Sequence, residues 1–300
     1  MTLFFRFCAR ALQRLSIPAV ACLSLAACSA TDVVNSLTPD DGYRVETGLA
    51  YGPGERYLFD LYRPDQPRKD APLIVFFYGG GWDSGSREDY LFIGQAFAAK
   101  GCTVAIPDYR LYPEVGWRGF MEDSARAVAH LAENHSDVQS SDRGLVLAGH
   151  SAGAYIATLL ALDGDWLACA GTDVCRIESV IGLAGPYDFL PLRSKKLRDI
   201  FGPGEAGPET QPVAHADAGG PPMLLASGSN DVVVLPRNTR ALSDRLRGVG
   251  VSVTERIYED VSHTQIVGAM SVPFRSLAPT HDDVFAFLAG NPARARANCD

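Results

Sequence analysis

The segment Leu145-Val-Leu-Ala-Gly-His-Ser-Ala-Gly-Ala-Tyr-Ile-Ala-Thr-Leu-Leu160 decides the fold. It joins an apolar run, typical of a buried strand, to a helical run through Gly149-His150-Ser151-Ala152-Gly153. Small residues flank the serine because larger side chains would clash with neighbouring backbone in so tight a strand-to-helix turn. The turn exposes the Ser151 hydroxyl beside the free amides of a helix N-terminus, which stabilise an oxyanion. The segment therefore predicts a nucleophilic serine on a strand–turn–helix unit.

The rest of the chain repeats this alternation of apolar runs and helical patterns. The expected strands are residues 72–78, 102–107, 144–149, 179–184, 223–227 and 251–258, and the expected helices are 87–100, 119–134, 152–163 and 236–248. This order predicts an α/β fold with a mostly parallel central sheet and helices on both faces. Two alternating segments, 43–50 and 56–62, flank Tyr-Gly-Pro-Gly and predict a β-hairpin. Residues 186–222, rich in Gly and Pro, predict a small cap or lid, with a plain surface excursion as the alternative.

Further candidate residues follow other strands, at the carboxyl edge where open α/β sheets bind ligands. A serine hydroxyl is a weak nucleophile and needs a base, usually an imidazole. His263 lies in a polar loop after the last expected strand, whereas His150 adjoins Ser151 and is expected to have a structural or pocket-lining role. Surface or cap positions account for His130, His135, His215 and His281. Asp231, which follows the strand at 223–227, gives the chain order Ser, Asp, His that accompanies a nucleophile elbow, and Asp188 is the alternative acid.

A glycine-rich stretch, Tyr78-Gly-Gly-Gly-Trp82, follows the expected strand at 72–77. Glycines there leave backbone N–H groups free to point at a substrate oxygen, which predicts an oxyanion loop. An ordinary glycine-rich turn is the alternative.

The first 27 residues indicate a signal peptide, since three arginines precede an apolar run too short to span a bilayer. The run ends in Leu25-Ala-Ala-Cys28, which resembles a bacterial lipobox. This resemblance implies that Cys28 carries a fatty acyl group such as palmitate and becomes the first residue of a membrane-anchored lipoprotein. Ser29 favours sorting to the outer membrane, on its periplasmic side. An ordinary signal peptide cleaved near Ala27 or Ala30 is the alternative.

Three parts are therefore expected: a signal peptide at 1–27, a linker at 28–42, and one α/β domain at 43–300 that contains the cap. Cleavage removes three arginines and no acidic residue, so the net charge changes from −8 to about −11. So acidic a chain without a basic stripe is a poor partner for nucleic acid. No metal or organic cofactor is expected.

Four of the seven cysteines lie in the expected domain: Cys102, Cys169, Cys175 and Cys299. In an oxidising compartment, Cys169 and Cys175 predict a disulfide that closes a small loop. Two unpaired thiols are the alternative. A zinc site is disfavoured because no histidine lies near the pair.

Together these motifs resemble the α/β-hydrolase superfamily, and within it the carboxylesterases related to hormone-sensitive lipase and kynurenine formamidase. The resemblance starts near residue 43 and rests on Tyr78-Gly-Gly-Gly-Trp82, Pro107-Asp-Tyr-Arg-Leu-Tyr-Pro-Glu114, Gly149-His-Ser-Ala-Gly-Ala154, Gly228-Ser-Asn-Asp231 and His263. It implies that Gly80, Gly81 and Ala152 supply oxyanion amides, and that residues 108–114 brace the site. Tyr78 departs from the histidine that commonly opens the oxyanion motif, although both side chains form hydrogen bonds.

The resulting prediction is a serine carboxylesterase that acts on a small-molecule ester through an acyl-enzyme. Ser151 attacks the carbonyl, His263 transfers the proton, and Asp231 orients His263. An amidase, a formamidase or a peptidase on the same scaffold would use the same groups. A catalytically silent surface binding protein is the alternative from a different class.

Overall fold

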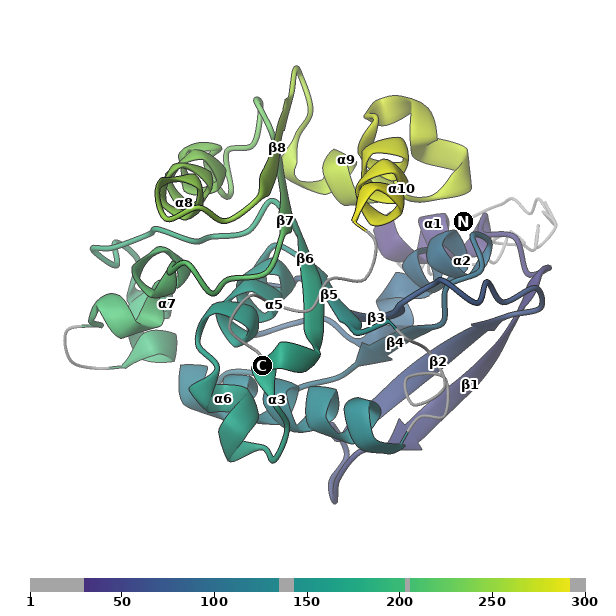
Figure 1. The fold of residues 1–300 in the computed structure, drawn as a ribbon, viewed down its shortest axis with the longest axis horizontal. Coiled ribbons are helices and arrows are strands. Elements are labelled where there is room, and N and C mark those ends of the chain that lie inside the picture. The colour runs from purple at the N-terminus through teal and green to yellow at the C-terminus, as the bar shows by residue number, and fades with distance from the viewer. Residues whose placement is uncertain (1–29, 135–142, 203–205, 292–300) are drawn as a thin grey trace, which may run out of the picture.

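One sheet of eight strands organises the computed structural model, which describes residues 30–134, 143–202 and 206–291 (Figure 1). The strand order is β1-β2-β4-β3-β5-β6-β7-β8. Their bounds are β1 (Tyr43–Ala50), β2 (Leu58–Pro64), β3 (Leu73–Phe77), β4 (Val104–Pro107), β5 (Leu145–His150), β6 (Ile177–Leu183), β7 (Met223–Gly228) and β8 (Val253–Tyr258). Strands β3 to β8 run parallel to one another, whereas β1 and β2 form an antiparallel hairpin at one edge. The mostly parallel α/β sheet is confirmed.

The central strands β3, β5, β6 and β7 are buried along their whole length. This burial explains their uninterrupted apolar sequences, because helices cover both faces of a parallel sheet. On one face lie α3 (Trp117–Asn134), α5 (Ala152–Leu162) and α8 (Arg237–Gly248); on the other lie α2 (Leu91–Ala98) and α10 (Thr280–Gly290) (Figure 1). Phe97 of α2 and Phe285 of α10 pack with their ring centroids 5.4 Å apart.

Several elements were not expected from the sequence. The expected linker contains the helix α1 (Ala30–Ser36), whose Asn35 donates a hydrogen bond of 2.9 Å to the carbonyl of Glu88. The segment after β8 contains α9 (His263–Gly268) and the 3₁₀ stretch Val272–Leu277. Within the described part of the chain, no helix combines the length and the apolar character that crossing a membrane requires.

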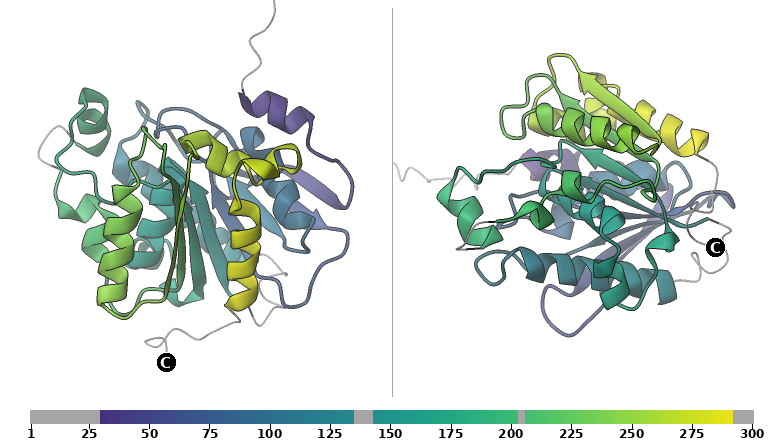
Figure 2. Two further views of the ribbon diagram at one scale, coloured as in Figure 1. Left: turned by 90° about the horizontal axis from the view of Figure 1, so that it is seen from above. Right: turned by 60° about the vertical axis from the view of Figure 1, so that its left-hand side comes forward.

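The described residues of the expected cap form the helix α7 (Lys195–Phe201) and two 3₁₀ turns, Pro208–Thr210 and Pro212–His215. Its Phe201 ring packs 5.0 Å from the ring of Trp82, which follows β3, and 5.6 Å from that of Tyr155 in α5. Lys196 forms an ion pair with Asp83. Figures 1 and 2 show α7 on the same side of the sheet as α5 and α8. The segment is therefore packed onto the loop that follows β3.

The predicted disulfide between Cys169 and Cys175 is wrong. Cys169 is a free, exposed thiol at the end of α6 (Asp165–Cys169). Cys175, in the 3₁₀ turn Val174–Arg176, is disulfide-bonded, but neither Cys169 nor the free, buried Cys102 is its partner. Sequence spacing does not fix the direction of the Cβ vectors, on which a disulfide depends. Cys28 lies outside the described residues.

Candidate active site

Ser151 occupies the sharp turn between β5 and α5. Its backbone has φ 54° and ψ −120°, a conformation that L-residues rarely adopt and that is typical of a strained nucleophile elbow. The flanking glycines are required by close backbone approach, because a Cβ at Gly149 would overlap the carbonyl of Gly153, and one at Gly153 would overlap the carbonyl of Phe77. The turn therefore presents the Ser151 hydroxyl at the carboxyl edge of the sheet.

The structure brings Ser151, His263 and Asp231 together from the ends of three parallel strands. His263 Nε2 lies 2.9 Å from Ser151 Oγ, and His263 Nδ1 lies 2.7 Å from Asp231 Oδ2. A carboxylate accepts the Nδ1 proton, so Nε2 carries the lone pair that can take the serine proton. The side chain of Asp231 is 0% exposed and that of His263 is 12% exposed, so both partners are shielded from water.

The carboxylate of Asp231 is held by its own loop. Its Oδ1 accepts hydrogen bonds from the backbone N–H groups of Val233, at 2.9 Å, and Val234, at 2.8 Å. Oδ2 is thereby directed to His263. Asp188, the alternative acid, instead presents its backbone N–H to Asn238 Oδ1 at 2.9 Å. The structure thus pairs the histidine with Asp231 and not with Asp188.

His263 begins a helix where the sequence suggests only a polar loop. Ser262 is the N-cap of α9, and its backbone N–H donates to Gln265 Oε1 at 2.8 Å in a capping box. The pattern Ser-x-x-Gln is a recognisable helix-start signal, and it could have predicted this short helix. The cap fixes the backbone on which the catalytic imidazole is mounted.

The glycine loop after β3 turns through positive φ at Gly80 (127°) and Gly81 (60°). The Gly80 carbonyl accepts hydrogen bonds from the N–H groups of Asp83 and Ser84, so it points into the turn. Because a trans peptide directs its N–H opposite to its C=O, the Gly81 N–H points away from that turn. Ala152, as the first residue of α5, has an N–H without an intrahelical acceptor. These amides are suited to stabilising an oxyanion.

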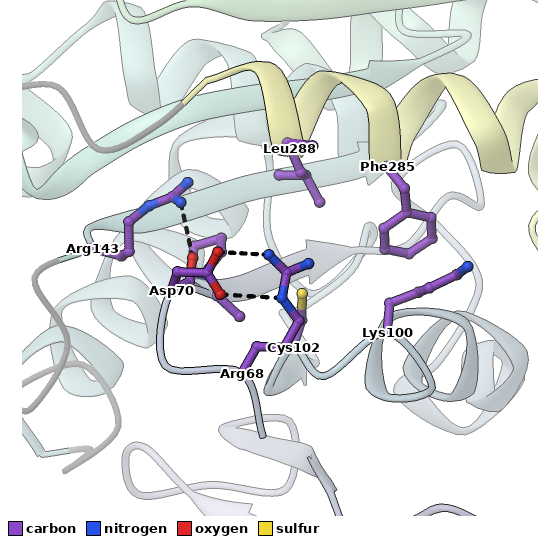
Figure 3. Close-up of a pocket in the computed structure, with 10 residues that line it drawn as sticks. Arg68, Asp70, Lys100, Cys102, Arg143, Phe285 and Leu288 are labelled. Carbon is purple, nitrogen blue, oxygen red and sulfur yellow. Dashed lines mark hydrogen bonds and ion pairs between the residues drawn. The ribbon is translucent and has the colours of Figure 1, made fainter. Parts of the chain in front are cut away.

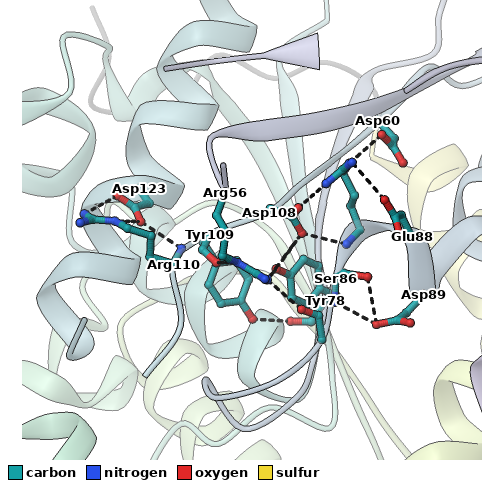
Figure 4. Close-up of polar contacts among 12 residues, drawn as sticks. Arg56, Asp60, Tyr78, Ser86, Glu88, Asp89, Asp108, Tyr109, Arg110 and Asp123 are labelled. Carbon is teal, nitrogen blue, oxygen red and sulfur yellow. Dashed lines mark hydrogen bonds and ion pairs between the residues drawn. The ribbon is translucent and has the colours of Figure 1, made fainter. Parts of the chain in front are cut away.

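Tyr78 braces the oxyanion loop through a buried polar network (Figure 4). Its hydroxyl donates to Asp108 Oδ1 at 2.9 Å and accepts from Arg56 Nη2 at 2.7 Å. Asp108 also accepts from the backbone N–H of Arg87 and forms an ion pair with its guanidinium. Burial raises the pKa of Tyr78 well above its ordinary value, so the phenol keeps its proton. The tyrosine thus makes the hydrogen bonds that tie the start of the loop to Asp108.

A separate cavity of about 510 Å³ lies at the opposite edge of the sheet (Figure 3). Its walls include Arg68, Cys102 and Arg143, which precede β3, β4 and β5, and Phe285 from α10. Arg68 is already paired with Asp70 at 2.7 Å. Because the triad lies at the carboxyl edge, this cavity is not part of the active site. Among the described residues, no cluster of three or more His, Cys, Asp or Glu side chains is arranged to hold a metal ion.

Residues 59–246 match the family model described as BD-FAE. The chain belongs to the BD-FAE family. The matched range contains Ser151 and Asp231 and ends before His263, which the geometry adds to the site. Together with the triad, this membership makes the chain an enzyme of the serine hydrolase class.

Curated relatives of this BD-FAE chain include kynurenine formamidase of Salmo salar, which is 29% identical over 69% of the chain and 70% of its own length. Esterase LipC of Mycobacterium tuberculosis is 29% identical over 68% of the chain, and isoprenylcysteine α-carbonyl methylesterase ICME of Arabidopsis thaliana is 27% identical over 74%. The matches span only 55% of LipC and 57% of ICME.

Solved structures show the same fold. A carbohydrate esterase from gut microbiota has a TM-score of 0.72 at 17% identity and covers 85% of the chain and 98% of its own. Thermogutta terrifontis esterase 2 has a TM-score of 0.67 at 23% identity and covers 85% of the chain and 97% of its own. These likenesses confirm the α/β-hydrolase fold.

Proposed function

We propose that this BD-FAE protein is a serine carboxylesterase that cleaves small-molecule esters through an acyl-enzyme. The observation that carries the proposal is the hydrogen-bonded chain from Ser151 Oγ through the His263 imidazole to Asp231, with distances of 2.9 Å and 2.7 Å. Such a chain activates a hydroxyl that is otherwise a weak nucleophile. The esterase names of LipC and ICME support an ester as the substrate.

In the first half-reaction, Ser151 Oγ attacks the ester carbonyl while its proton passes to His263 Nε2. The carbonyl oxygen becomes an oxyanion, which the N–H groups of Gly81 and Ala152 stabilise. Gly80 precedes Gly81 in the same loop and shapes its turn. The imidazolium is stabilised by Asp231 and donates its proton to the alkoxide as the C–O bond breaks. The alcohol leaves, and the acyl group stays on Ser151.

In the second half-reaction, His263 Nε2 takes a proton from water, and the resulting hydroxide equivalent attacks the acyl carbonyl. A second oxyanion forms at the same amides and collapses, and Ser151 Oγ recovers the proton as the carboxylic acid leaves.

A formamidase is the second candidate, supported by the match to kynurenine formamidase over 70% of that protein. The same groups would attack a formamide carbonyl, and His263 would protonate the departing amine. The two candidates differ in the leaving group and not in the catalytic residues.

Purified protein assayed with p-nitrophenyl esters of graded acyl length and with an N-formyl anilide tests this proposal. We expect the esters to be hydrolysed faster than the anilide. We also expect ester turnover to fall once the acyl chain exceeds a certain length, and this length measures the depth of the acyl pocket. Preference for the formyl anilide would favour the formamidase, and no turnover of either class would contradict both.

We further propose that the protein is exported and anchored at the periplasmic side of the outer membrane through an acyl group on Cys28. The proposal is supported by the sequence Leu25-Ala-Ala-Cys28, which lies outside the described residues. Labelling with radioactive palmitate should be lost in Cys28→Ala. Labelling that persists in this variant would contradict the anchor.

A further inference from the structure

His150 lies between the two loops that carry the catalytic groups. It is the last residue of β5, 5% exposed, and its Nε2 lies 2.9 Å from the backbone carbonyl of His263. The rings of the two histidines pack with centroids 4.8 Å apart and are tilted by 43° to each other. On its other side, Nδ1 would lie 3.0 Å from a Cβ placed on Gly79, the first glycine of the oxyanion loop. One buried ring therefore touches both the base and the oxyanion loop.

The contact with His263 defines the protonation of this ring. A carbonyl oxygen only accepts hydrogen bonds, so the proton of the neutral His150 ring is on Nε2. Burial first, and the neighbouring His263 second, lower the pKa of His150 to about 3. The ring consequently stays neutral when His263 becomes an imidazolium during the reaction.

The other ring nitrogen shows that this arrangement has a cost. Nδ1 is buried and has no hydrogen-bond partner among the described residues. An unpaired buried acceptor destabilises the folded protein, because it has given up its hydrogen bond to water. A residue used only for packing could avoid this cost with an apolar ring, so the Nε2–H donor is the feature that distinguishes histidine here.

We propose that His150 is a positioning residue for the general base. By holding the His263 carbonyl, its Nε2–H keeps the His263 imidazole within hydrogen-bond distance of Ser151. The proposal rests on the function proposed above, because it concerns the same reaction. It assigns His150 no contact with the reacting atoms.

Two amide substitutions separate this role from packing. The amide nitrogen of glutamine reaches the position of histidine Nε2, whereas that of asparagine is one bond too short. We expect His150→Asn to lower kcat for a p-nitrophenyl ester by about tenfold to a hundredfold, the scale set by small misplacements of catalytic groups. KM should change little, and His150→Gln should recover most of the loss. His150→Phe, which keeps the ring and removes the donor, should behave like His150→Asn.

The matched control is His281→Asn. His281 is also 5% exposed, and its buried Nε2 has no hydrogen-bond partner in the part of the chain that the structure describes, but it lies in α10, outside the triad. Melting temperatures of all variants report folding. His281→Asn should lower the melting temperature without changing kcat of the folded enzyme.

The rate at which a fluorophosphonate labels Ser151 makes the test independent of the substrate. Labelling of wild type that slows in His150→Asn and His150→Phe and recovers in His150→Gln supports the proposal. Equal labelling and kcat in all folded variants would overturn it. Wild type that is neither labelled nor active on esters would instead contradict the proposed function.

Discussion

Asp231 shows how single residues control the reaction. It is buried, and two backbone amides and His263 share its carboxylate oxygens. In Asp231→Asn, the side chain keeps its shape but can favour the wrong tautomer of His263 by offering an N–H to Nδ1. We expect kcat for an ester to fall by about a thousandfold to ten-thousandfold, as in related triads. Asp188→Asn is the matched control and should retain wild-type kcat; a larger loss in this control would assign the acid role to Asp188.

His150 also predicts how stability depends on pH. The pKa of its folded form is about 3, because burial disfavours the charged ring, whereas an unfolded histidine has a pKa of about 6.5. Between these values the unfolded chain binds the proton more readily, so stability falls as the pH falls from 6.5 towards 3. The contribution is about 1 kcal/mol per pH unit within that window.

Urea unfolding of wild type and His150→Gln at pH 7, 5 and 4 measures this effect. The variant lacks the titrating ring, so its free energy of unfolding should decrease less between pH 7 and 4 than that of wild type. Parallel decreases in the two proteins would show that the ring is not held neutral.

At the scale of elements, backbone geometry tightly constrains the oxyanion loop. Gly80 combines φ 127° with a direct approach to the Ser84 carbonyl, which a Cβ would overlap. In Gly80→Ala the turn has to open, and the amides move from the position of the oxyanion. Loss of one oxyanion donor costs about a hundredfold to a thousandfold in kcat.

Gly250→Ala is the control for backbone strain alone. Gly250 has φ 90°, but apart from its chain neighbours no heavy atom of the described residues lies within 4 Å of the position that a Cβ would take, so the substitution strains the backbone without a clash. It should lower stability and leave kcat of the folded enzyme unchanged. Similar kcat values for the Gly80 and Gly250 variants would contradict the assignment of the loop.

The sequence was most informative where one physical requirement dominates an element. The five buried strands β3 to β7 are indicated by mostly apolar runs, and their observed bounds differ from the expected ones by only a few residues. In β8, at the edge of the sheet, only the last residue is buried, although the sequence places this strand equally well. Ser151 was evident because its glycine neighbours are forced by backbone contacts. Asp231 and His263 meet because they follow β7 and β8, which are neighbours in the sheet. The chain order Ser, Asp, His that accompanies a nucleophile elbow indicates this pairing. In contrast, α1 and α9 are too short for periodicity to reveal.

Other features depend on tertiary structure and could not be predicted. Cys169, at the end of α6, is a free thiol and is not paired with Cys175, and nothing in the spacing of the two cysteines shows this. The link from His150 to the His263 carbonyl joins residues 113 positions apart. From the sequence, only a structural or pocket-lining role is expected for His150.

At the scale of the whole molecule, the catalytic residues lie at the carboxyl ends of the parallel strands, and a stabilising ion pair lies at their amino ends. Arg143 and Glu178 form a buried ion pair where β5 and β6 begin, far from their carboxyl ends. Glu178→Ala removes the carboxylate that neutralises this buried guanidinium, although the hydrogen bonds of Arg143 to the carbonyls of Asp70 and Asn291 remain. We expect the free energy of unfolding to fall by about 3–5 kcal/mol, with kcat of the folded enzyme unchanged. Urea unfolding measures the change in stability, and active-site titration gives kcat per folded site. A loss of kcat per folded site would show that the ion pair at the amino ends of the strands affects the active site at their carboxyl ends.

The central claim is that the BD-FAE chain uses Ser151 as a nucleophile activated by His263. Its most direct test is peptide mass mapping after reaction with an alkyl phosphonate inhibitor. We predict one phosphonyl group on Ser151 in wild type, no adduct in Ser151→Ala, and strongly slowed labelling in His263→Ala. An adduct on another residue, or equal labelling rates in wild type and His263→Ala, would contradict the account.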